Sequence, residues 1–495
     1  MIVRTLCECL DYRWVKGSVD IDIAGIAYDS REVQEGYLFV AIRGLEQDGH
    51  DFIEDAIQRG AVFVVGEDED CITNSKVTAG AVVPDSRLAL SALASCFYGH
   101  PSQKISLIGV TGTNGKTSTT TLLKTILRSS GHKTGLFGTI ENSLNDEILP
   151  AKHTTPESKE LHEMLALLVE KGATYAVMEV SSHALALKRV HDCDFNVGVF
   201  TNLTQDHLDF HDNMEDYFLA KKILFDMIDS KYKEYGDMRY VVLNRDDPYS
   251  KRIAKNLACK VIYYGIHKKN PDYQARNIRM GLNGTFFEIK HPHGLFELHL
   301  TMTGVFSVYN CLAAVAVAME EGIEPEIIIR ALEETKVPGR FEPINEGQKF
   351  AVVVDYAHTP DSLENAIKTA QEVTENRVIT VFGCGGDRDR GKRPIMGNLG
   401  VSLSDVAIIT SDNPRTEDPQ AIIQDILEGV ESTNEYQVIV DRKEAIRIAV
   451  AMAKTGDLVL IAGKGHEDYQ IIGHQKYPFS DILIAREAIK ERTEF

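Results

Sequence analysis

A glycine-rich segment, TGTNGKTST at residues 111–119, has the residue types of a phosphate-binding loop. Glycine at Gly112 and Gly115 lets backbone amides close around phosphate oxygens. Lys116 supplies positive charge to the terminal phosphates, and the hydroxyl of Thr117 can ligate Mg²⁺. The segment therefore predicts a site for a nucleoside triphosphate and its magnesium ion.

This loop and the other unusual polar motifs each come directly after a short apolar run. Parallel sheets bind ligands at the carboxyl ends of their strands, so we expect these motifs to line a ligand crevice in each domain. The expected strands are ISLIGV (105–110), YAVMEV (175–180), VGVFTNL (197–203), RYVVLN (239–244), FAVVVDYA (350–357), RVITVFG (377–383), VAIITSDN (406–413) and DLVLIAGKG (457–465). The motifs at their ends are TGTNGKT, SSH, TQDH, DNPR and GKGHE.

The alternation of apolar runs with amphipathic stretches predicts an α/β fold with mostly parallel sheets. At ~100–200 residues per domain, a chain of 495 residues is expected to form three domains. We place a small α/β domain at 1–100, a domain carrying the phosphate loop at 101–337, and a second α/β series at 338–495. Within the second domain, residues 284–306 are expected to form an antiparallel hairpin, and residues 309–323 a buried helix.

The composition excludes several classes of protein. A formal net charge of -20 argues against a nucleic-acid partner, because binding to nucleic acid relies on clustered Lys and Arg. No apolar run reaches the ~18–20 residues of a membrane span, and no secretion signal is evident, so we expect a cytoplasmic protein. The eight cysteines are expected to be reduced thiols. Cys7 and Cys9 have CxC spacing but no Cys or His cluster near them in the sequence, so we do not expect them to hold a metal.

Lys221 falls on the apolar stripe of a predicted helix. Helical spacing places it on the face of Tyr217, Leu224 and Ile228, whereas Lys222 points about 100° away. A buried ammonium is costly, so such a lysine tends to lose its proton and become a nucleophile. The alternative is a lysine that extends its amine to water.

The phosphate loop departs from the general GxxxxGK[ST] pattern because Val110 stands at its first glycine position. Its GTNGKT form resembles the Mur ligase family and the related folylpolyglutamate synthetases. The resemblance to the Mur ligases covers nearly the whole chain, through DSREV (29–33), GTNGKT, HTTP (153–156), MEVSSHAL (178–185), FTNLTQDHLDFH (200–211), YFLAK (217–221), VPGRFE, DYAHTPDSL, GCGGDRDRGKRP (383–394), DNPR (412–415) and GKGHEDYQ (463–470). It implies three domains: an N-terminal UDP-substrate domain, a central ATPase domain and a C-terminal Rossmann-like domain for the incoming amino acid.

The resemblance implies an ATP-dependent ligase that converts a carboxylate to an acyl phosphate, from which an amine displaces phosphate. Such a transfer depends mainly on positioning and on cations. The residues that the family assigns to catalysis are Lys116, Glu179, His207 and Lys221. Its Mg²⁺ ligands are Thr117, Glu179, His207 and Lys221, the last as a carbamate formed with CO₂. Its ATP-binding residues are Gly112, Thr113, Asn114, Gly115, Lys116, Thr117, Asn244, Asn310, Arg340 and Asp355.

The two other implied substrates are a UDP-N-acetylmuramoyl dipeptide that ends in D-glutamate and a free diamino acid. The resemblance assigns the dipeptide to Ser30, Thr154, Thr155, Ser181 and Arg189. It assigns the amino acid to Arg388, Asp412, Asn413, Pro414, Arg415, Gly463 and Glu467. The implied reaction belongs to the synthesis of peptidoglycan precursors.

The arginine of DNPR favours meso-diaminopimelate over L-lysine as the amino acid. The two differ by one carboxylate, which a planar guanidinium is suited to hold, and lysine-adding relatives typically replace this arginine. Arg415 and Arg388 are the candidates for that contact. An alternative is that Arg415 only pairs with the nearby Glu417 or Asp418.

Three other functions are weighed against this one. They are the same ligase with L-lysine, a folylpolyglutamate-type ligase, and a non-catalytic ATP-binding paralogue in a cell-wall complex. DNPR disfavours the first, and DSREV with GKGHE disfavours the second. Retention of the catalytic residues disfavours the third. We expect a monomer.

Overall fold

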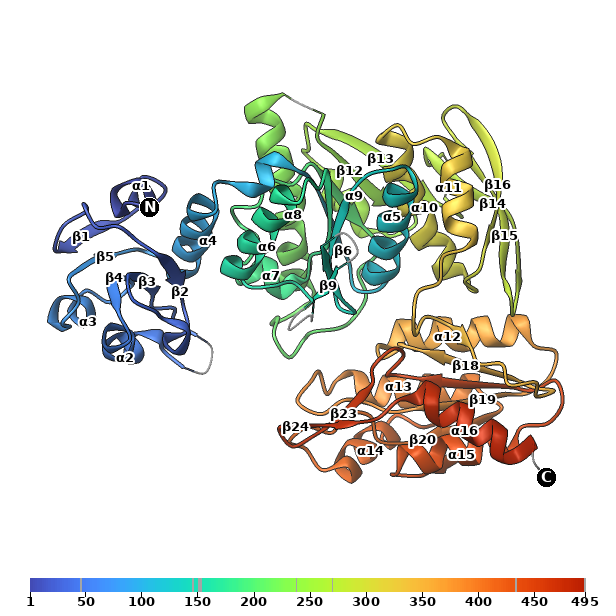
Figure 1. Cartoon of the computed structure of the whole chain (residues 1–495). Coiled ribbons are helices and arrows are strands. Elements are labelled where there is room, and N and C mark those ends of the chain that lie inside the picture. Colours follow the sequence, from blue (N-terminus) through green and yellow to red (C-terminus); the bar gives the residue numbers. More distant parts are fainter. Residues whose placement is uncertain are drawn as a thin grey trace. The chain divides into compact units, whose positions relative to one another are not determined.

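The computed structural model describes residues 1–44, 47–144, 147–149, 154–236, 238–268, 270–431 and 434–493. His153, the first residue of the HTTP motif, lies outside the described residues. The chain divides into two compact units, here called unit 1 (1–109, 132–198 and 220–240) and unit 2 (110–131, 199–219 and 241–495). The described residues form three larger sheets and one two-stranded sheet (Figure 1).

The first sheet lies in unit 1 and has five strands in the order β1-β5-β4-β3-β2. Strands β2 to β5 pair in parallel, and β1 is antiparallel to β5. Leu38 and Phe63 enter one buried cluster, while Phe39 and Val64 enter another, so the sheet is packed on both faces. Its elements are α1 (Val3–Cys7), β1 (Arg13–Lys16), β2 (Gly25–Ala27), η1 (Ser30–Glu32), β3 (Tyr37–Val40), η2 (Gly49–Phe52), α2 (Ile53–Gln58), β4 (Ala61–Gly66), α3 (Glu69–Asn74), β5 (Ala79–Val82), α4 (Ser86–Phe97) and η3 (Pro101–Lys104).

The second sheet has eleven strands in the order β16-β15-β14-β13-β12-β11-β6-β10-β7-β8-β9. Strands β10 and β7 pair in parallel, whereas β14, β15 and β16 are successively antiparallel. Its strands are β6 (Ser106–Thr111), β7 (Thr134–Phe137), β8 (Asn142–Leu144), β9 (Glu147–Leu149), β10 (Tyr175–Glu179), β11 (Val197–Phe200), β12 (Tyr240–Asn244), β13 (Lys260–Gly265), β14 (Tyr273–Gly281), β15 (Gly284–His291) and β16 (Gly294–Leu300). The helices of this part of the chain are α5 (Lys116–Ser129), α6 (Ser158–Glu170), α7 (Ser182–Ala186), α8 (Met214–Tyr235), α9 (Tyr249–Ala254), α10 (Val305–Glu320) and α11 (Pro325–Glu333).

The hairpin expected at 284–306 is confirmed for β15 and β16 but was predicted too long. Val305 and Phe306 already belong to α10, the buried helix expected at 309–323. Gly304, with φ 106°, directly precedes this helix in a conformation that L side chains rarely adopt. The glycine therefore marks the change from strand to helix that the alternating pattern did not reveal.

The third sheet lies in unit 2 and has the order β17-β18-β22-β19-β20-β21. All its neighbouring pairs are parallel except β17 with β18. Leu363 of α12 and Met396 of α13 pack on one face, and Ile446 of α15 and Ile489 of α16 on the other, which is the doubly wound arrangement expected. The elements are β17 (Glu342–Pro343), β18 (Ala351–Asp355), α12 (Pro360–Val373), β19 (Val378–Phe382), α13 (Lys392–Leu403), β20 (Val406–Ile409), α14 (Pro419–Leu427), β21 (Glu435–Val438), α15 (Arg442–Met452), β22 (Leu458–Ala462), β23 (Tyr469–Ile472), β24 (Gln475–Pro478) and α16 (Asp481–Thr493).

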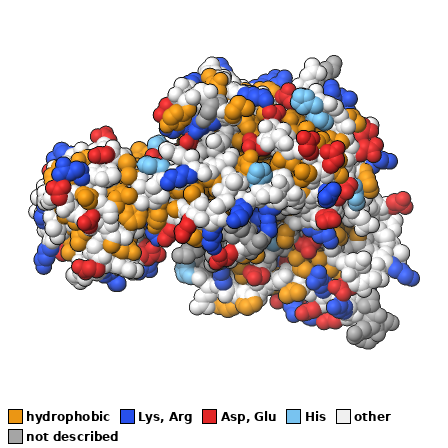
Figure 2. All heavy atoms as spheres, turned by 45° about the horizontal axis from the view of Figure 1, so that its top comes forward, with side chains coloured by type: hydrophobic (Ala, Val, Ile, Leu, Met, Phe, Trp, Pro, Cys, Tyr) orange, Lys and Arg blue, Asp and Glu red, His pale blue; other side chains and the backbone are white. Residues whose placement is uncertain are grey.

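The surface agrees with a composition that is 25% charged. On the face shown in Figure 2, acidic and basic side chains are interspersed rather than separated into regions of one sign. In the described part of the chain, no helix has both the length and the apolar composition needed to cross a membrane.

Candidate functional site

The phosphate loop is anchored by the residues that follow β11. Thr113 N donates to Asn202 O at 2.9 Å, and Asn114 N donates to Asn202 Oδ1 at 2.9 Å. Thr201 Oγ1 donates to Asn114 O at 2.6 Å. These bonds fix the backbone of the loop before any phosphate is bound, which lowers the ordering cost of binding.

Lys116 and two glycines give the loop its shape. Lys116 Nζ reaches back across the loop and donates to the carbonyls of Gly112 (2.9 Å) and Thr113 (2.8 Å). Gly115 has φ 88°, and a Cβ there would lie 2.2 Å from Oδ1 of the buried Asn310 on α10. Only glycine therefore fits this turn, and the loop presents its amides and one ammonium at the start of α5.

Two of the expected nucleotide-binding residues in unit 2 are engaged with the protein itself. Asn244 Nδ2 donates to Thr201 O at 2.8 Å, and its Oδ1 accepts from Asp246 N at 3.0 Å. Asn244 thus ties the end of β12 to the strand end that anchors the phosphate loop. Asn114 Nδ2 donates to Asp361 Oδ2 at 2.8 Å, at the start of α12.

Arg340 and Asp355 lie together where β18 ends. The guanidinium carbon of Arg340 lies 4.5 Å from the ring centroid of Tyr356. Asp355 Oδ2 accepts from Phe341 N at 2.7 Å. Burial raises the pKa of Asp355 to about 6 even though Arg340 opposes the shift. The pair places a cation and a weakly acidic carboxyl group at one strand end, where parallel sheets bind their ligands.

A charged cluster joins His207 to residues that the sequence analysis did not assign. Asp206 Oδ1 lies 3.3 Å from Lys392 Nζ, and Asp206 Oδ2 lies 3.4 Å from His207 Nε2. Burial alone would raise the pKa of Asp206, but Lys392 and His207 outweigh it and hold that pKa well below its usual range. The motifs TQDH and GKRP contain these residues, but their 186-residue separation gave no sign that they meet.

His358, another unassigned residue, is neutral in this cluster. Burial lowers its pKa to about 4, and the charge of Lys392 adds to the effect. Its Nδ1 lies 2.7 Å from Tyr356 O, so a neutral ring donates there and leaves Nε2 as an acceptor.

In unit 1, Glu179 occupies the end of β10 and is 1% exposed. Its Oε1 accepts from Thr139 N at 2.8 Å, and its Oε2 accepts from Thr139 Oγ1 at 3.0 Å. A Cβ at Gly138 would lie 2.5 Å from Oε1. Thr139 therefore fixes the orientation of the carboxylate, and carboxylate oxygens are ligands that a hard divalent cation prefers.

Four of the residues expected at the UDP-linked substrate come together beside Glu179. Thr154 Oγ1 lies 3.1 Å from Thr139 Oγ1, and Thr155 Oγ1 donates to Glu179 O at 2.8 Å. Ser181 N donates to Thr155 Oγ1 at 3.1 Å, and Ser181 Oγ caps α7. Arg189 donates through a terminal nitrogen to Thr155 O at 3.2 Å. The group presents hydroxyls and a guanidinium on one edge.

Two features of this group were not expected from the sequence. Arg189 Nε lies 2.7 Å from Glu157 Oε1, so part of its fork is already paired. Ser30 is buried in the five-stranded part of the chain, where its hydroxyl bonds the carboxylate of Asp55 and lowers the pKa of that group.

Lys221 is 1% exposed in α8, so the alternative of an amine extended to water is wrong. Leu224 and Ile228, one and two turns further on, are fully buried on the same stripe. Lys222 instead forms an ion pair with Asp226 on the outer side of the helix. The helical spacing therefore identified the buried lysine correctly.

The residues expected to bind the incoming amino acid follow the ends of β20 and β22, and several of them contact one another. Asn413 Nδ2 donates to Glu467 Oε2 at 3.0 Å, and the buried Lys464 donates to both side chains. Asp412 accepts from Asn413 N through Oδ1, while its buried Oδ2 has no hydrogen-bond partner among the residues that the structure describes. A Cβ at Gly463 would lie 2.6 Å from that Oδ2. An unpartnered carboxylate oxygen is an acceptor ready for an ammonium group.

Arg415 lies beside this cluster and is held by carbonyl groups. One terminal nitrogen donates to Gly386 O at 2.8 Å and contacts Asn413 O at 3.4 Å. Burial lowers its pKa, and the nearby guanidinium of the exposed Arg388 lowers it further. Glu417 N donates to Pro414 O, which fixes the turn.

The alternative that Arg415 pairs with a neighbouring carboxylate is wrong. Glu417 instead accepts from Arg393 at 2.7 Å and from Arg390 at 2.6 Å. Among the described residues, Arg415 has no carboxylate within ion-pair distance. Among the described side chains, neither Arg415 nor Arg388 forms an ion pair with a carboxylate, and a ligand carboxylate would supply that partner.

The described geometry combines a phosphate-binding loop at a helix start with a second cluster of polar and charged side chains, and sequence comparison identifies the family of the chain. Three family models match the chain: "Mur ligase family, catalytic domain" at 22–98, "Mur ligase middle domain" at 110–318 and "Mur ligase, glutamate ligase domain" at 339–465. The chain belongs to the Mur ligase family.

Two similar relatives and one solved structure carry the same name. The UDP-N-acetylmuramoyl-L-alanyl-D-glutamate--2,6-diaminopimelate ligase of Syntrophomonas wolfei is 48% identical over 481 residues, 97% of each chain. The ligase of the same name from Geobacillus thermodenitrificans is 48% identical over 494 residues, covering 99% of this chain and 100% of that protein. A solved structure of a ligase of this name is 32% identical, with a TM-score of 0.69 and full coverage of both chains.

Proposed function

We propose that this protein adds meso-diaminopimelate to the D-glutamate side-chain carboxylate of UDP-N-acetylmuramoyl-L-alanyl-D-glutamate, with hydrolysis of ATP to ADP and phosphate. The observation that carries the choice of amino acid is the pair Arg415 and Arg388, which lacks a carboxylate partner among the described side chains. The full-length likeness to ligases of that name supports the same reaction. The product is a precursor of peptidoglycan.

The chemistry proceeds through an acyl phosphate. A carboxylate oxygen of D-glutamate attacks the γ-phosphorus of ATP, and ADP leaves. The amine of the incoming amino acid then attacks the acyl carbon, the C–O bond to phosphate breaks, and the amine gives up a proton. Lys116 stabilises charge on the transferred phosphoryl group, and the loop amides orient it.

We propose that the Mg²⁺ ligands are Thr117, Glu179, His207 and Lys221, with Lys221 acting as its carbamate. The residues suit this role, because Glu179 is a buried carboxylate oriented by Thr139 and Lys221 is a buried amine that can be neutral and nucleophilic. Bound Mg²⁺ would neutralise charge on the phosphates.

The remaining assignments follow the same proposal. ATP is bound by the loop residues with Asn310, Arg340 and Asp355. Asn244 supports the loop through its hydrogen bond to Thr201 O. Thr154, Thr155, Ser181, Arg189 and Ser30 serve the UDP-linked dipeptide. The amino group of diaminopimelate is received by Asp412, Asn413 and Glu467. We further propose domains at 1–100, 101–337 and 338–495 and a monomer that acts in the cytoplasm.

The test is formation of the product from purified protein, ATP, Mg²⁺, the UDP-linked dipeptide and meso-diaminopimelate. Mass spectrometry should find one new species equal to dipeptide plus diaminopimelate less one water, with equimolar ADP and phosphate. The variant Lys116→Ala should form none. ATP hydrolysis without this product would refute the proposal.

A further inference from the structure

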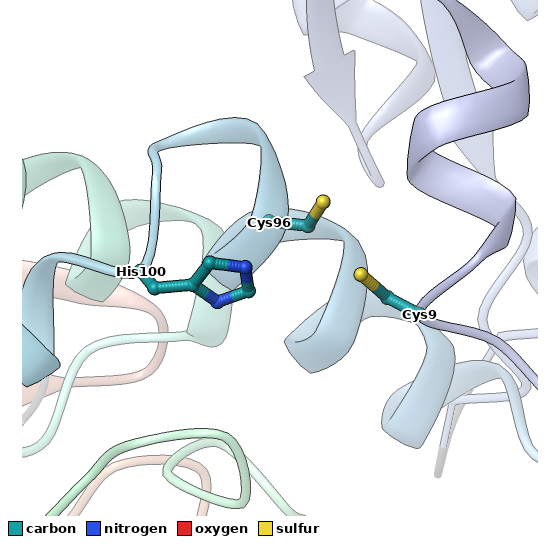
Figure 3. A group of neighbouring side chains, drawn as sticks. All are labelled: Cys9, Cys96 and His100. Atoms are coloured by element: carbon teal, nitrogen blue, oxygen red, sulfur yellow. The ribbon is translucent and has the colours of Figure 1, made fainter.

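Three side chains outside all the assigned sites bring their donor atoms together in unit 1. One ligand atom each from Cys9, Cys96 and His100 lies within 4.8 Å of the others (Figure 3). No Cys or His cluster lies near Cys9 in the sequence, but the fold brings Cys96 and His100 to it. Cys7, its CxC neighbour, is buried at 2% exposure in the core of the first sheet instead.

The local backbone explains why these three residues meet. Cys9 follows α1, where Cys9 N donates to Leu6 O at 3.3 Å. Cys96 lies in the last turn of α4 and is 7% exposed. His100 has φ 52°, and this left-handed conformation turns the chain back so that His100 N donates to Ser95 O at 2.7 Å. The turn brings the imidazole of His100 alongside the end of α4, where it faces the sulfurs of Cys9 and Cys96 (Figure 3).

The imidazole is oriented as a metal-binding histidine usually is. Ser95 Oγ lies 3.1 Å from Nδ1 of His100, so one ring nitrogen is held by a hydroxyl. The other nitrogen, Nε2, is then available to a cation with its direction already set. Metal-binding histidines almost always have such a partner on the second ring nitrogen.

We propose that Cys9, Cys96 and His100 form a binding site for a zinc-class divalent cation, with water as the fourth ligand. Two sulfurs and one imidazole are the donors that zinc takes in tetrahedral sites, whereas Mg²⁺ prefers oxygen. The site is thus chemically distinct from the proposed magnesium site. It contains none of the residues assigned to the ligase reaction.

Binding at this site is coupled to proton release. Thiolate sulfur is the form that binds the cation, so the cation must displace a proton from each thiol that it binds. Affinity should therefore fall as the pH falls. A hydrogen bond from the Cys96 thiol to Thr5 O, at 3.8 Å, would be given up at the same time.

The position of the site suggests what a bound cation does. Cys9 belongs to the N-terminal segment. Cys96 lies near the end of the stretch matched by the first family model, 22–98, and His100 lies between that stretch and the one matched by the second model, 110–318. A cation would cross-link the start of the chain to this connection. Its effect should be on stability rather than on the chemistry of ligation.

The test uses the full-length, tag-free protein, reduced and stripped of metal under anaerobic conditions, and titrated with Co²⁺ and then Zn²⁺. We expect one equivalent of Co²⁺ to give the absorption bands of thiolate-bound tetrahedral cobalt, which Zn²⁺ then abolishes. Cys9→Ser and His100→Gln should each weaken binding by at least about tenfold. Cys71→Ser, which alters an exposed cysteine outside the cluster, should bind like the unchanged protein.

Three results would overturn the proposal. They are the absence of thiolate bands in the reduced protein, binding that is unchanged in both Cys9→Ser and His100→Gln, and the same rise of the melting temperature with Zn²⁺ in these variants as in the unchanged protein. Reduced protein that binds no metal, but that air oxidises to a Cys9–Cys96 disulfide with loss of two hydrogens, would identify a redox pair instead. The Ser95→Ala variant should retain the bands and bind about tenfold more weakly.

Discussion

Replacing Arg415 by glutamine tests the assignment of the amino-acid site most sharply. Arg415 has φ 51°, a left-handed conformation that glutamine resists as much as arginine does, so the backbone cost cancels in the comparison. The substitution removes a guanidinium whose pKa is lowered by burial and by Arg388. The substitution removes the repulsion from Arg388 but also the hydrogen bond to Gly386 O, so the free energy of unfolding should change little.

The expected effect is on the use of diaminopimelate. A hydrogen bond to a charged group contributes about 1.5–3 kcal/mol, and each 1.4 kcal/mol is about tenfold. The kcat/KM for meso-diaminopimelate should fall by about 10-fold to 150-fold. The loss is no larger because Arg388 still offers a cation to the same carboxylate. The KM values for ATP and for the UDP-linked dipeptide should not change.

Phosphate release at varied diaminopimelate concentration measures this effect, with Arg390→Gln as the matched control. Arg390 lies in the loop that carries Arg388, between β19 and α13, but it is 69% exposed and pairs with Glu417, so its loss should leave the KM for diaminopimelate unchanged. The assignment would be refuted if Arg415→Gln left that KM within about twofold, well below the loss expected for one charged hydrogen bond. An equal rise in all three KM values would indicate a general structural defect.

Three further predictions follow from the described contacts. Lys221→Arg should lower kcat at least about 100-fold and abolish the carbamate signal that ¹³C-bicarbonate gives in NMR spectra. The control Lys222→Arg alters a lysine paired with Asp226 and should do neither. A carbamate signal in Lys221→Arg would contradict the assignment. Gly115→Ala should weaken ATP binding, measured by calorimetry, at least about tenfold, because its Cβ would lie 2.2 Å from Asn310 Oδ1. The control Gly131→Ala, at φ 91° with open space around it, should affect stability alone. Equal losses of ATP affinity in the two variants would refute this explanation. Because the pKa of Asp355 is raised to about 6, the folded protein binds this proton more tightly than the unfolded protein and loses stability as the proton leaves. The melting temperature of Asp355→Asn minus that of the unchanged protein should therefore increase as the pH rises from 5 to 7.5. A difference that stays constant would exclude a raised pKa.

Much of the fold could be predicted because it rests on local patterns. The apolar runs became β6, β10, β11, β12, β18, β19, β20 and β22, because a buried parallel strand needs a continuous apolar segment. The burial of Lys221 followed from helical spacing in the same way. The short antiparallel pair β8 and β9 was not predicted, since its three-residue strands have no distinctive alternation.

The parts of the site that could not be predicted depend on pairs far apart in the sequence. Asp206 meets Lys392, and Cys9 meets Cys96 and His100, only because the fold returns the chain to the same place. The unpaired Oδ2 of Asp412 is likewise a property of the packed structure. Residue types limit what each side chain can do, but only the tertiary arrangement decides which partners it has.

The most direct measurement of the central claim is a competition between meso-diaminopimelate and L-lysine at equal concentration, with ATP, Mg²⁺ and the UDP-linked dipeptide. Mass spectrometry then gives the ratio of the two products. The diaminopimelate product should exceed the lysine product by at least about 100-fold, because lysine leaves the half-buried guanidinium of Arg415 without its carboxylate. Comparable amounts of the two products would contradict the account of the amino-acid site.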